Sequence, residues 1–292
     1  MLGELRELWK FREMLVTMVQ REMKIRYKNS VIGFFWSLLN PLVTVAVMTV
    51  VFKYLQNNPT PNLGAYVLAA YLPYMFFQLC LLDSAQSVLN GLDLAKKIYF
   101  PREILPLTMI VSNLIHFLLA LAVFFVYLLG VNILFPGVSP FQVTSLWLPV
   151  LLIVNIALVT GFGLIISALN TFYEDVKYIV SVLLYLLFFI SPIMYFSEAV
   201  YNAPVNKSHP WVYTLYHLNP VATLSTSYRK LLLAPQPVEM RVTHNGVPAV
   251  ETYPALAMDW TMFGITAVVS FGLLIFGYHL FNRLKWKFVE RP

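Results

Sequence analysis

The sequence predicts an all-α membrane protein that crosses the bilayer several times. Of its 292 residues, 59% are hydrophobic and only 12% are charged, and the mean hydropathy is +0.70. A soluble domain of this length needs a larger share of polar residues to cover its surface. The apolar residues also gather in runs of roughly 20, the length that a helix needs to cross the hydrocarbon core of a membrane.

Six of these runs are long enough to be transmembrane helices. They lie at about 31–54, 65–90, 104–135, 146–169, 178–196 and 260–281. A seventh apolar stretch, 211–233, carries charged and polar residues that suit a re-entrant or outer-face helical hairpin better than a span. We therefore expect residues 31–292 to form a single six-span transmembrane domain, with the hairpin before the last span.

Residues 1–30 have the pattern of an amphipathic helix lying on the membrane surface. Charged residues occupy the remaining faces of this helix, and of them only Arg12 interrupts the apolar stripe. The stripe consists of Leu5, Leu8, Trp9, Leu15, Val16, Val19 and Met23. The pattern fits a topology anchor and fits equally an interfacial helix that also contacts a cytoplasmic partner.

The distribution of Lys and Arg predicts the orientation. Of the 20 basic residues, 15 lie in the N-terminal segment, in the short turns at 92–103 and 170–177 and in the tail at 282–292. The positive-inside rule places these segments, and both termini, in the cytoplasm. The 197–259 segment is then the main outer segment. The net charge of +6 is explained by topology and lipid contact and is no argument for nucleic-acid binding.

Several chemistries lack their sequence patterns. There is no G-x-x-x-x-G-K-[ST] phosphate loop, no H-E-x-x-H and no His/Cys cluster, and Cys80 is the single cysteine. We expect no catalytic residue, no metal site and no cofactor in this chain. His116, within the third span, is expected to form a hydrogen bond to a neighbouring helix, and Asp83 to pair with a neighbour or reach the interface.

Aromatic residues make up 15% of the chain and crowd the spans. One interpretation is a conduit whose rings stack on sugars; the other is that these side chains face lipid, where membrane proteins favour aromatics. The residues considered for such a path are Phe34, Trp36, Tyr185, Phe188, Phe189 and Tyr195.

The segment 92–103 is the only charged break between about Tyr66 and Phe135. A loop this short cannot fold alone, so its aromatic and basic residues are expected to serve something that docks on it. The candidate docking residues are Lys96, Lys97, Ile98, Tyr99, Phe100, Pro101, Arg102 and Glu103.

Four segments, in order, resemble the type-2 ATP-binding-cassette export permeases of the polysaccharide and polyol-phosphate branch. They are REMKIRYKNS at 21–30 followed by GFFWSLLNP at 33–41, KKIYFPREILPL at 96–107, NTFYEDV at 170–176 leading to SPIMY at 191–195, and LNP at 218–220 with Tyr228-Arg229. Together they cover residues 12 to 232. Glu174 departs from the family, which commonly carries a basic residue there.

The resemblance implies a permease that exports O-antigen, capsule or wall teichoic acid precursors from the bacterial cytoplasmic membrane. It implies a homodimer paired with two copies of a separate ATPase subunit, which would bind ATP and Mg²⁺. The 92–103 turn would dock on that ATPase. The second turn would contribute Tyr173, Glu174, Asp175 and Lys177.

The resemblance also implies a lipid-linked glycan substrate, typically carried on undecaprenyl pyrophosphate. A basic rim would attract this pyrophosphate or merely anionic lipid headgroups, and both interpretations remain. The rim consists of Arg21, Lys24, Arg26 and Lys28. Other readings are an exporter of a non-glycan lipid or drug, a membrane-embedded glycan-processing enzyme, and a passive channel.

Overall fold

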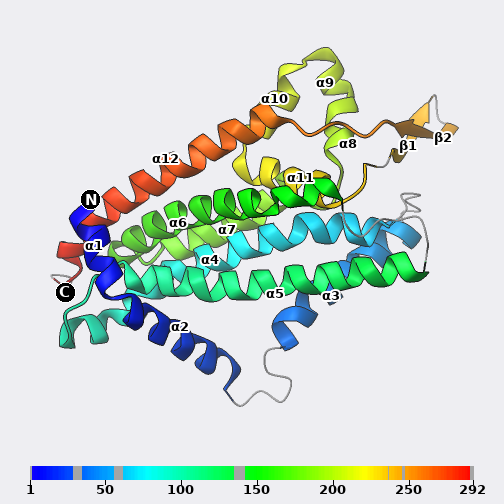
Figure 1. Ribbon diagram of the computed structural model, residues 1–292. Coiled ribbons are helices and arrows are strands. Elements are labelled where there is room, and N and C mark those ends of the chain that lie inside the picture. Colours follow the sequence, from blue (N-terminus) through cyan, green and yellow to red (C-terminus); the bar gives the residue numbers. More distant parts are fainter. Residues whose placement is uncertain are drawn as a thin grey trace.

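The computed structural model describes residues 2–28, 35–55, 62–134, 142–235, 237–244 and 247–289. This part of the chain is nearly all helical. Its long helices are α3 (Phe35–Val50), α4 (Leu63–Lys97), α5 (Ile104–Leu134), α6 (Leu148–Phe172), α7 (Val176–Ile190) and α12 (Trp260–Leu284). Figure 1 shows them as one elongated bundle, with the two termini at one end.

Among the described residues, four helical segments are long and apolar enough to cross a membrane. They are Leu63–Lys97, Ile104–Ile133, Val143–Phe172 and Trp260–Phe288. The first and fifth predicted spans correspond to the shorter apolar helices Leu39–Lys53 and Val176–Ile190. The polytopic fold class is therefore confirmed, whereas six crossings stay a prediction.

The N-terminal segment is two helices instead of the one expected, α1 (Leu2–Lys10) and α2 (Arg12–Tyr27). The break falls at Phe11. Leu8, Phe11 and Leu15 pack against a buried cluster around Phe100 and Ile104, which explains where the chain bends. The apolar stripe is thus divided, because Trp9 and Val16 remain exposed.

Prolines set several helix ends. Ser191 takes an extended conformation (ψ 148°) before Pro192, so α7 stops at Ile190 instead of reaching residue 196 as predicted. Asn219 accepts a hydrogen bond from the Val221 amide (3.0 Å), and Pro220 occupies the first turn of α11 (Pro220–Leu232). In contrast, α6 runs without interruption through Gly161 and Gly163.

The helix α4 is the centre of the bundle. It packs against α3, α5, α6, α7 and α11, and its small residues, including Ala69, Ala70 and Ala85, are fully buried. On the other side of the bundle, α6 packs along α12. An alanine Cβ at Gly161 would lie only 2.6 Å from the Leu273 carbonyl carbon, so glycine permits this close approach of the two backbones.

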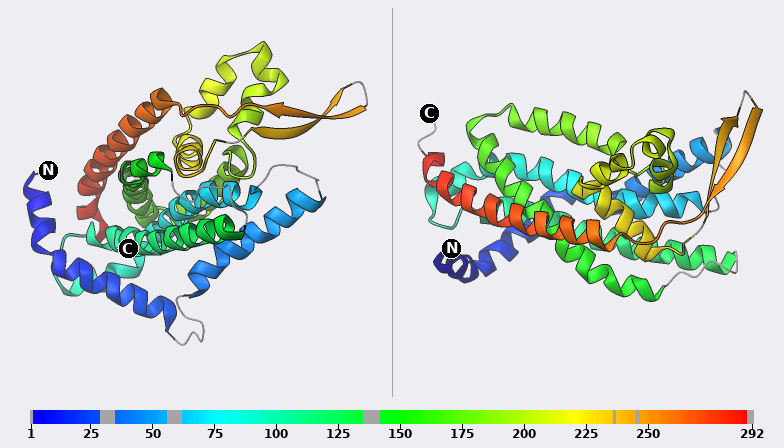
Figure 2. Two further views of the ribbon diagram at one scale, coloured as in Figure 1. Left: turned by 45° about the vertical axis from the view of Figure 1, so that its right-hand side comes forward. Right: turned by 90° about the horizontal axis from the view of Figure 1, so that it is seen from above.

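The predicted outer segment consists of short helices and a β-hairpin. It contains α8 (Ser197–Asn202), α9 (Pro204–Ser208), α10 (Trp211–His217) and α11, followed by an antiparallel hairpin of β1 (Val238–His244) and β2 (Val247–Tyr253). The views in Figure 2 place the hairpin at the opposite end of the bundle from the termini. We call these the hairpin end and the terminal end.

Candidate functional site

The turn between α4 and α5 lies at the terminal end and is only partly a surface loop. Helix α4 extends to Lys97, so the predicted turn begins six residues later than expected. Lys96 and Lys97 fall in its last turn, where positive charge favours the negative end of the helix dipole. Lys96, Lys97, Ile98 and Tyr99 are exposed, and the Tyr99 hydroxyl donates a hydrogen bond to Glu7 (2.9 Å). This hydrogen bond raises the pKa of Tyr99.

The second half of the turn is buried. Phe100, Pro101 and Glu103 are enclosed, and Arg102 is half-buried. Phe100 joins the cluster that α1 and α2 cover. These residues were predicted to dock a partner, but the structure gives three of them a packing role. The exposed part of the predicted docking segment is therefore Lys96–Tyr99.

The buried half of the turn contacts η3 (Lys285–Val289), the short helical segment after α12. The Lys285 Nζ lies 2.7 Å from the Glu103 Oε1, and the Glu103 side chain is only 1% exposed. Arg102 donates a hydrogen bond to the Lys285 carbonyl. Burial lowers the pKa of Arg102, and Glu103 opposes this shift.

The second turn, between α6 and α7, also lies at the terminal end. Tyr173, Glu174 and Asp175 are exposed, and the Lys177 Nζ lies 4.9 Å from the Tyr178 ring centre. Buried Asn170 holds the turn: its amide donates to the Ala85 carbonyl (2.7 Å), and its oxygen accepts from the Lys177 amide (3.0 Å). Both turns thus present exposed side chains at the terminal end, on separate helix connections.

The predicted basic rim lies on α2, but one member is already paired. Arg26 donates to Asp83 (2.9 Å) on α4 and to Asn113 (2.8 Å) on α5, whereas Arg21, Lys24 and Lys28 are exposed. Asn113 also donates to Asp83 (2.8 Å). Asp83 therefore has the neighbour that was expected for it. Arg26 therefore holds α2 against α4 and α5 through these hydrogen bonds.

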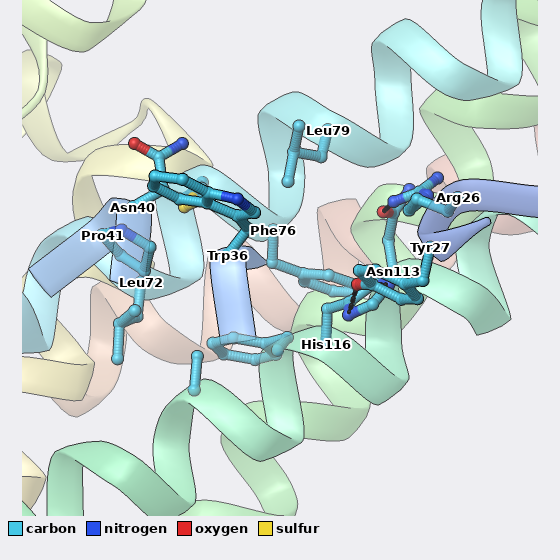
Figure 3. A pocket seen from close by; sticks show the side chains of 13 residues that line it. Arg26, Tyr27, Trp36, Asn40, Pro41, Leu72, Phe76, Leu79, Asn113 and His116 are labelled. Atoms are coloured by element: carbon cyan, nitrogen blue, oxygen red, sulfur yellow. Dashed lines mark hydrogen bonds between the residues drawn. The ribbon is translucent and has the colours of Figure 1, made fainter. Parts of the chain in front are cut away.

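A cavity of about 330 Å³ begins beside this network and is lined mainly by apolar residues of α3, α4 and α5. Figure 3 shows Tyr27 next to His116 and Trp36 at the wall. The Tyr27 hydroxyl is 3.0 Å from both Nδ1 and Nε2 of His116, and this contact is the expected hydrogen bond to a neighbouring helix. The lining is thus polar where Arg26, Asn113 and His116 meet and mainly apolar elsewhere, with Asn40 as a further polar residue.

The proposed path aromatics do not gather in one place. Trp36 lines the cavity, and Phe34 lies outside the described residues. Tyr185 and Phe189 are exposed on α7, whereas Phe188 packs inward on Tyr74 (ring centres 5.4 Å apart). The Tyr195 hydroxyl contacts the Tyr216 hydroxyl (2.9 Å) and donates to the Ile190 carbonyl (2.6 Å).

At the hairpin end, Arg229 on α11 is the main polar anchor. It is 4% exposed and donates to the carbonyls of Tyr66 (3.1 Å), Ile193 (3.0 Å) and Tyr195 (3.0 Å). Its guanidinium also lies 5.2 Å from the Phe196 ring centre. The chain leaves the helical conformation after α7, so carbonyls there lack intrahelical hydrogen bonds. Arg229 donates hydrogen bonds to two of them, those of Ile193 and Tyr195.

The four segments of the sequence that resemble a transporter family all lie within the region that a protein family matches. The ABC-2 type transporter family matches residues 13–233, from α2 to the end of α11. The chain belongs to the ABC-2 type transporter family. Since it combines this membership with long apolar helices, it is a multi-pass membrane protein.

Named relatives of this ABC-2 type transporter match between 60% and 95% of its length. It is 28% identical to the O-antigen export system permease protein RfbA of Klebsiella pneumoniae over 279 residues, which covers 95% of this chain and 94% of the relative. RfbA of Myxococcus xanthus is 30% identical over 231 residues (79% and 84%). The polysialic acid transport protein KpsM of Escherichia coli is 25% identical over 179 residues (60% and 67%).

Sequence reasoning missed several residues that organise this transporter. Lys285 was counted only as a topology charge, and Asn113 and Phe288 were not singled out. No local signal marks them, because their partners Glu103, Asp83 and Phe172 lie far away in the sequence. The sequence does indicate Arg229, since a charged residue in an apolar stretch needs a partner.

Proposed function

We propose that this chain is the permease subunit of an ATP-driven exporter of a lipid-linked polysaccharide across the bacterial cytoplasmic membrane. The observation that carries the proposal is its similarity to O-antigen export permeases along 94% of the length of the Klebsiella relative. Similarity to a polysialic acid transport protein supports the same substrate class. The alternative, an exporter of a non-glycan lipid or drug, has no comparable support.

The proposed topology has six crossings and a cytoplasmic terminal end. It requires α3 and α7 to cross together with the four longer helices. Two observations support it: basic residues concentrate in the segments of the terminal end, and both termini lie at that end in Figure 1.

A separate ATPase subunit would dock on the terminal end. The contact surface would be Lys96–Tyr99 of the first turn, with Tyr173, Glu174 and Asp175 of the second. Ile98 and Tyr99 support this proposal, because they are 49% and 72% exposed at a charged end of the protein. ATP and Mg²⁺ would bind to the ATPase and not to this chain.

The active assembly would contain two copies of this chain and two ATPase subunits. The exposed apolar face of α7, with Val182, Leu186 and Phe189, supports a surface covered by lipid or by a second copy. The substrate would enter with its undecaprenyl pyrophosphate near Arg21 and Lys24, which are exposed on α2, and near Lys28, which is exposed directly after it. Trp36 and the α7 aromatics would contact the polymer.

Deletion of the gene tests the substrate class. Loss of the permease is expected to leave lipid-linked polysaccharide in the cytoplasmic leaflet and to remove the polymer from the cell surface. Normal surface polymer, with a retained lipid or drug instead, would support the alternative exporter.

The docking surface is tested by Ile98→Asp. A charge here is expected to abolish co-purification of the ATPase without reducing expression of the permease. Val205→Asp is the matched control, since Val205 is 62% exposed on α9 at the hairpin end. If Ile98→Asp retains the ATPase as well as Val205→Asp does, this turn is not the docking surface.

A further inference from the structure

The segment η3 contacts both connections that face the proposed ATPase. Its first residue, Lys285, pairs with Glu103 of the first turn (2.7 Å). Its fourth residue, Phe288, is 1% exposed and packs on Phe172 (ring centres 5.7 Å apart), which ends α6 directly before the second turn. In the described part of the chain, η3 therefore lies between the two turns.

We propose that η3 is a strut that couples the two ATPase-facing turns to each other and to α12, with Lys285 as the positioning residue. This inference rests on the proposed function. A displacement of the first turn would be transmitted to η3 by the Glu103–Lys285 pair and by the Arg102 hydrogen bond to the Lys285 carbonyl. The packing of Phe288 on Phe172 would transmit the same displacement to the second turn.

The ion pair is suited to transmit a displacement because it is buried. The side chains of Lys285 and Glu103 are 11% and 1% exposed, and the Glu103 Oε2 has no hydrogen-bond partner in the described structure. A buried carboxylate that loses its cation is left uncompensated, so Glu103 cannot readily separate from Lys285. Exposed ion pairs lack this constraint, because water replaces either partner.

The strut is also continuous with the membrane bundle. The backbone at Lys285 stays helical (φ −54°, ψ −31°), and α12 leads into η3 without an intervening loop. Helix α12 in turn packs closely along α6, where Gly161 and Gly277 meet. A displacement at the turns therefore has a rigid route into α12, a membrane helix that the ATPase itself would not touch.

The test uses the complex with its ATPase, reconstituted in liposomes, and measures polysaccharide exported per ATP hydrolysed. The key variant is the neutral pair Glu103→Gln/Lys285→Met, which leaves no buried unpaired charge and therefore avoids the main folding penalty. We expect normal ATPase co-purification but a fall in export per ATP of about tenfold. Lys285→Arg should keep most of the coupling, because it retains the charge.

Lys287→Met is the matched control, since Lys287 lies exposed on the same segment, and it should export like the wild type. A neutral pair that exports as much polymer per ATP as the wild type overturns the inference. Equal loss in Lys287→Met also overturns it, because the effect would then not depend on the buried pair. A wild-type complex that exports no polysaccharide contradicts the proposed function instead.

Discussion

Replacing Gly161 by alanine is expected to force α6 and α12 apart. The new Cβ would lie 2.6 Å from the Leu273 carbonyl carbon and 2.7 Å from the Leu274 nitrogen. Favourable separations between such atoms are about 3.5–4.0 Å, so the helices must move by roughly 1 Å. The clashing atoms belong to the backbone and cannot rotate away, so the strain must be relieved by repacking of the helix pair.

The expected cost follows from two opposing effects. Overpacking of a well-packed interface costs about 1–3 kcal/mol. The better helix propensity of alanine returns roughly 0.5–1 kcal/mol. We therefore expect Gly161→Ala to lower the free energy of unfolding by roughly 1 kcal/mol, the difference between the midpoints of these ranges.

Unfolding by increasing SDS in mixed micelles, followed by circular dichroism, measures this change. Gly264→Ala and Gly272→Ala are matched controls on α12, because no atom lies within 4 Å of an added Cβ at either position. Both should match the wild type or exceed it slightly. The reasoning is refuted if Gly161→Ala unfolds at the same SDS fraction as these controls.

Two further predictions concern the hairpin end. Arg229→Met removes the donors to three carbonyls, so hydrogen exchange of residues 191–196 should accelerate strongly. Lys207→Met on exposed α9 should leave this exchange unchanged. Equal exchange in both variants would contradict the anchoring role of Arg229. Burial lowers the pKa of His217, whose Nδ1 lies 3.0 Å from the Tyr213 carbonyl and whose Nε2 has no partner in the described structure. Because the native pKa of His217 lies below its unfolded value of about 6.5, the folded state has its full stability above that pH and loses stability as the pH falls below it. Hydrogen exchange of 211–217, corrected for intrinsic rates, should therefore be faster at pH 5.5 than at pH 7.5, and His217→Asn should reduce the difference; an unchanged difference would assign it to another group.

The helical fold was predictable because it depends on composition and on long apolar runs. The second, third, fourth and sixth predicted spans correspond to α4, α5, α6 and α12. Their boundaries differ where local chemistry extends or ends a helix, as at Lys97 and at Ser191 before Pro192. The β-hairpin was missed although Asn245-Gly246, between two apolar-alternating segments, is a strong hairpin signal.

The site was less predictable because its contacts join distant parts of the chain. The sequence singled out the first turn, but nothing local indicates that Glu103 is buried against Lys285 while Ile98 is exposed. Arg26 was assigned to a basic rim because it lies among basic residues, yet the fold pairs it with Asp83 on another helix. Such pairing depends on how helices pack and not on spacing within one helix.

Export by purified components is the direct test of the proposed transport. Liposomes that contain this chain and its ATPase would be supplied with labelled lipid-linked polysaccharide on the ATPase side, and the polymer reaching the opposite side would be measured with and without ATP. The account predicts transfer that requires both ATP and the ATPase. Transfer without the ATPase, or ATP hydrolysis with no transfer of polysaccharide, would contradict it.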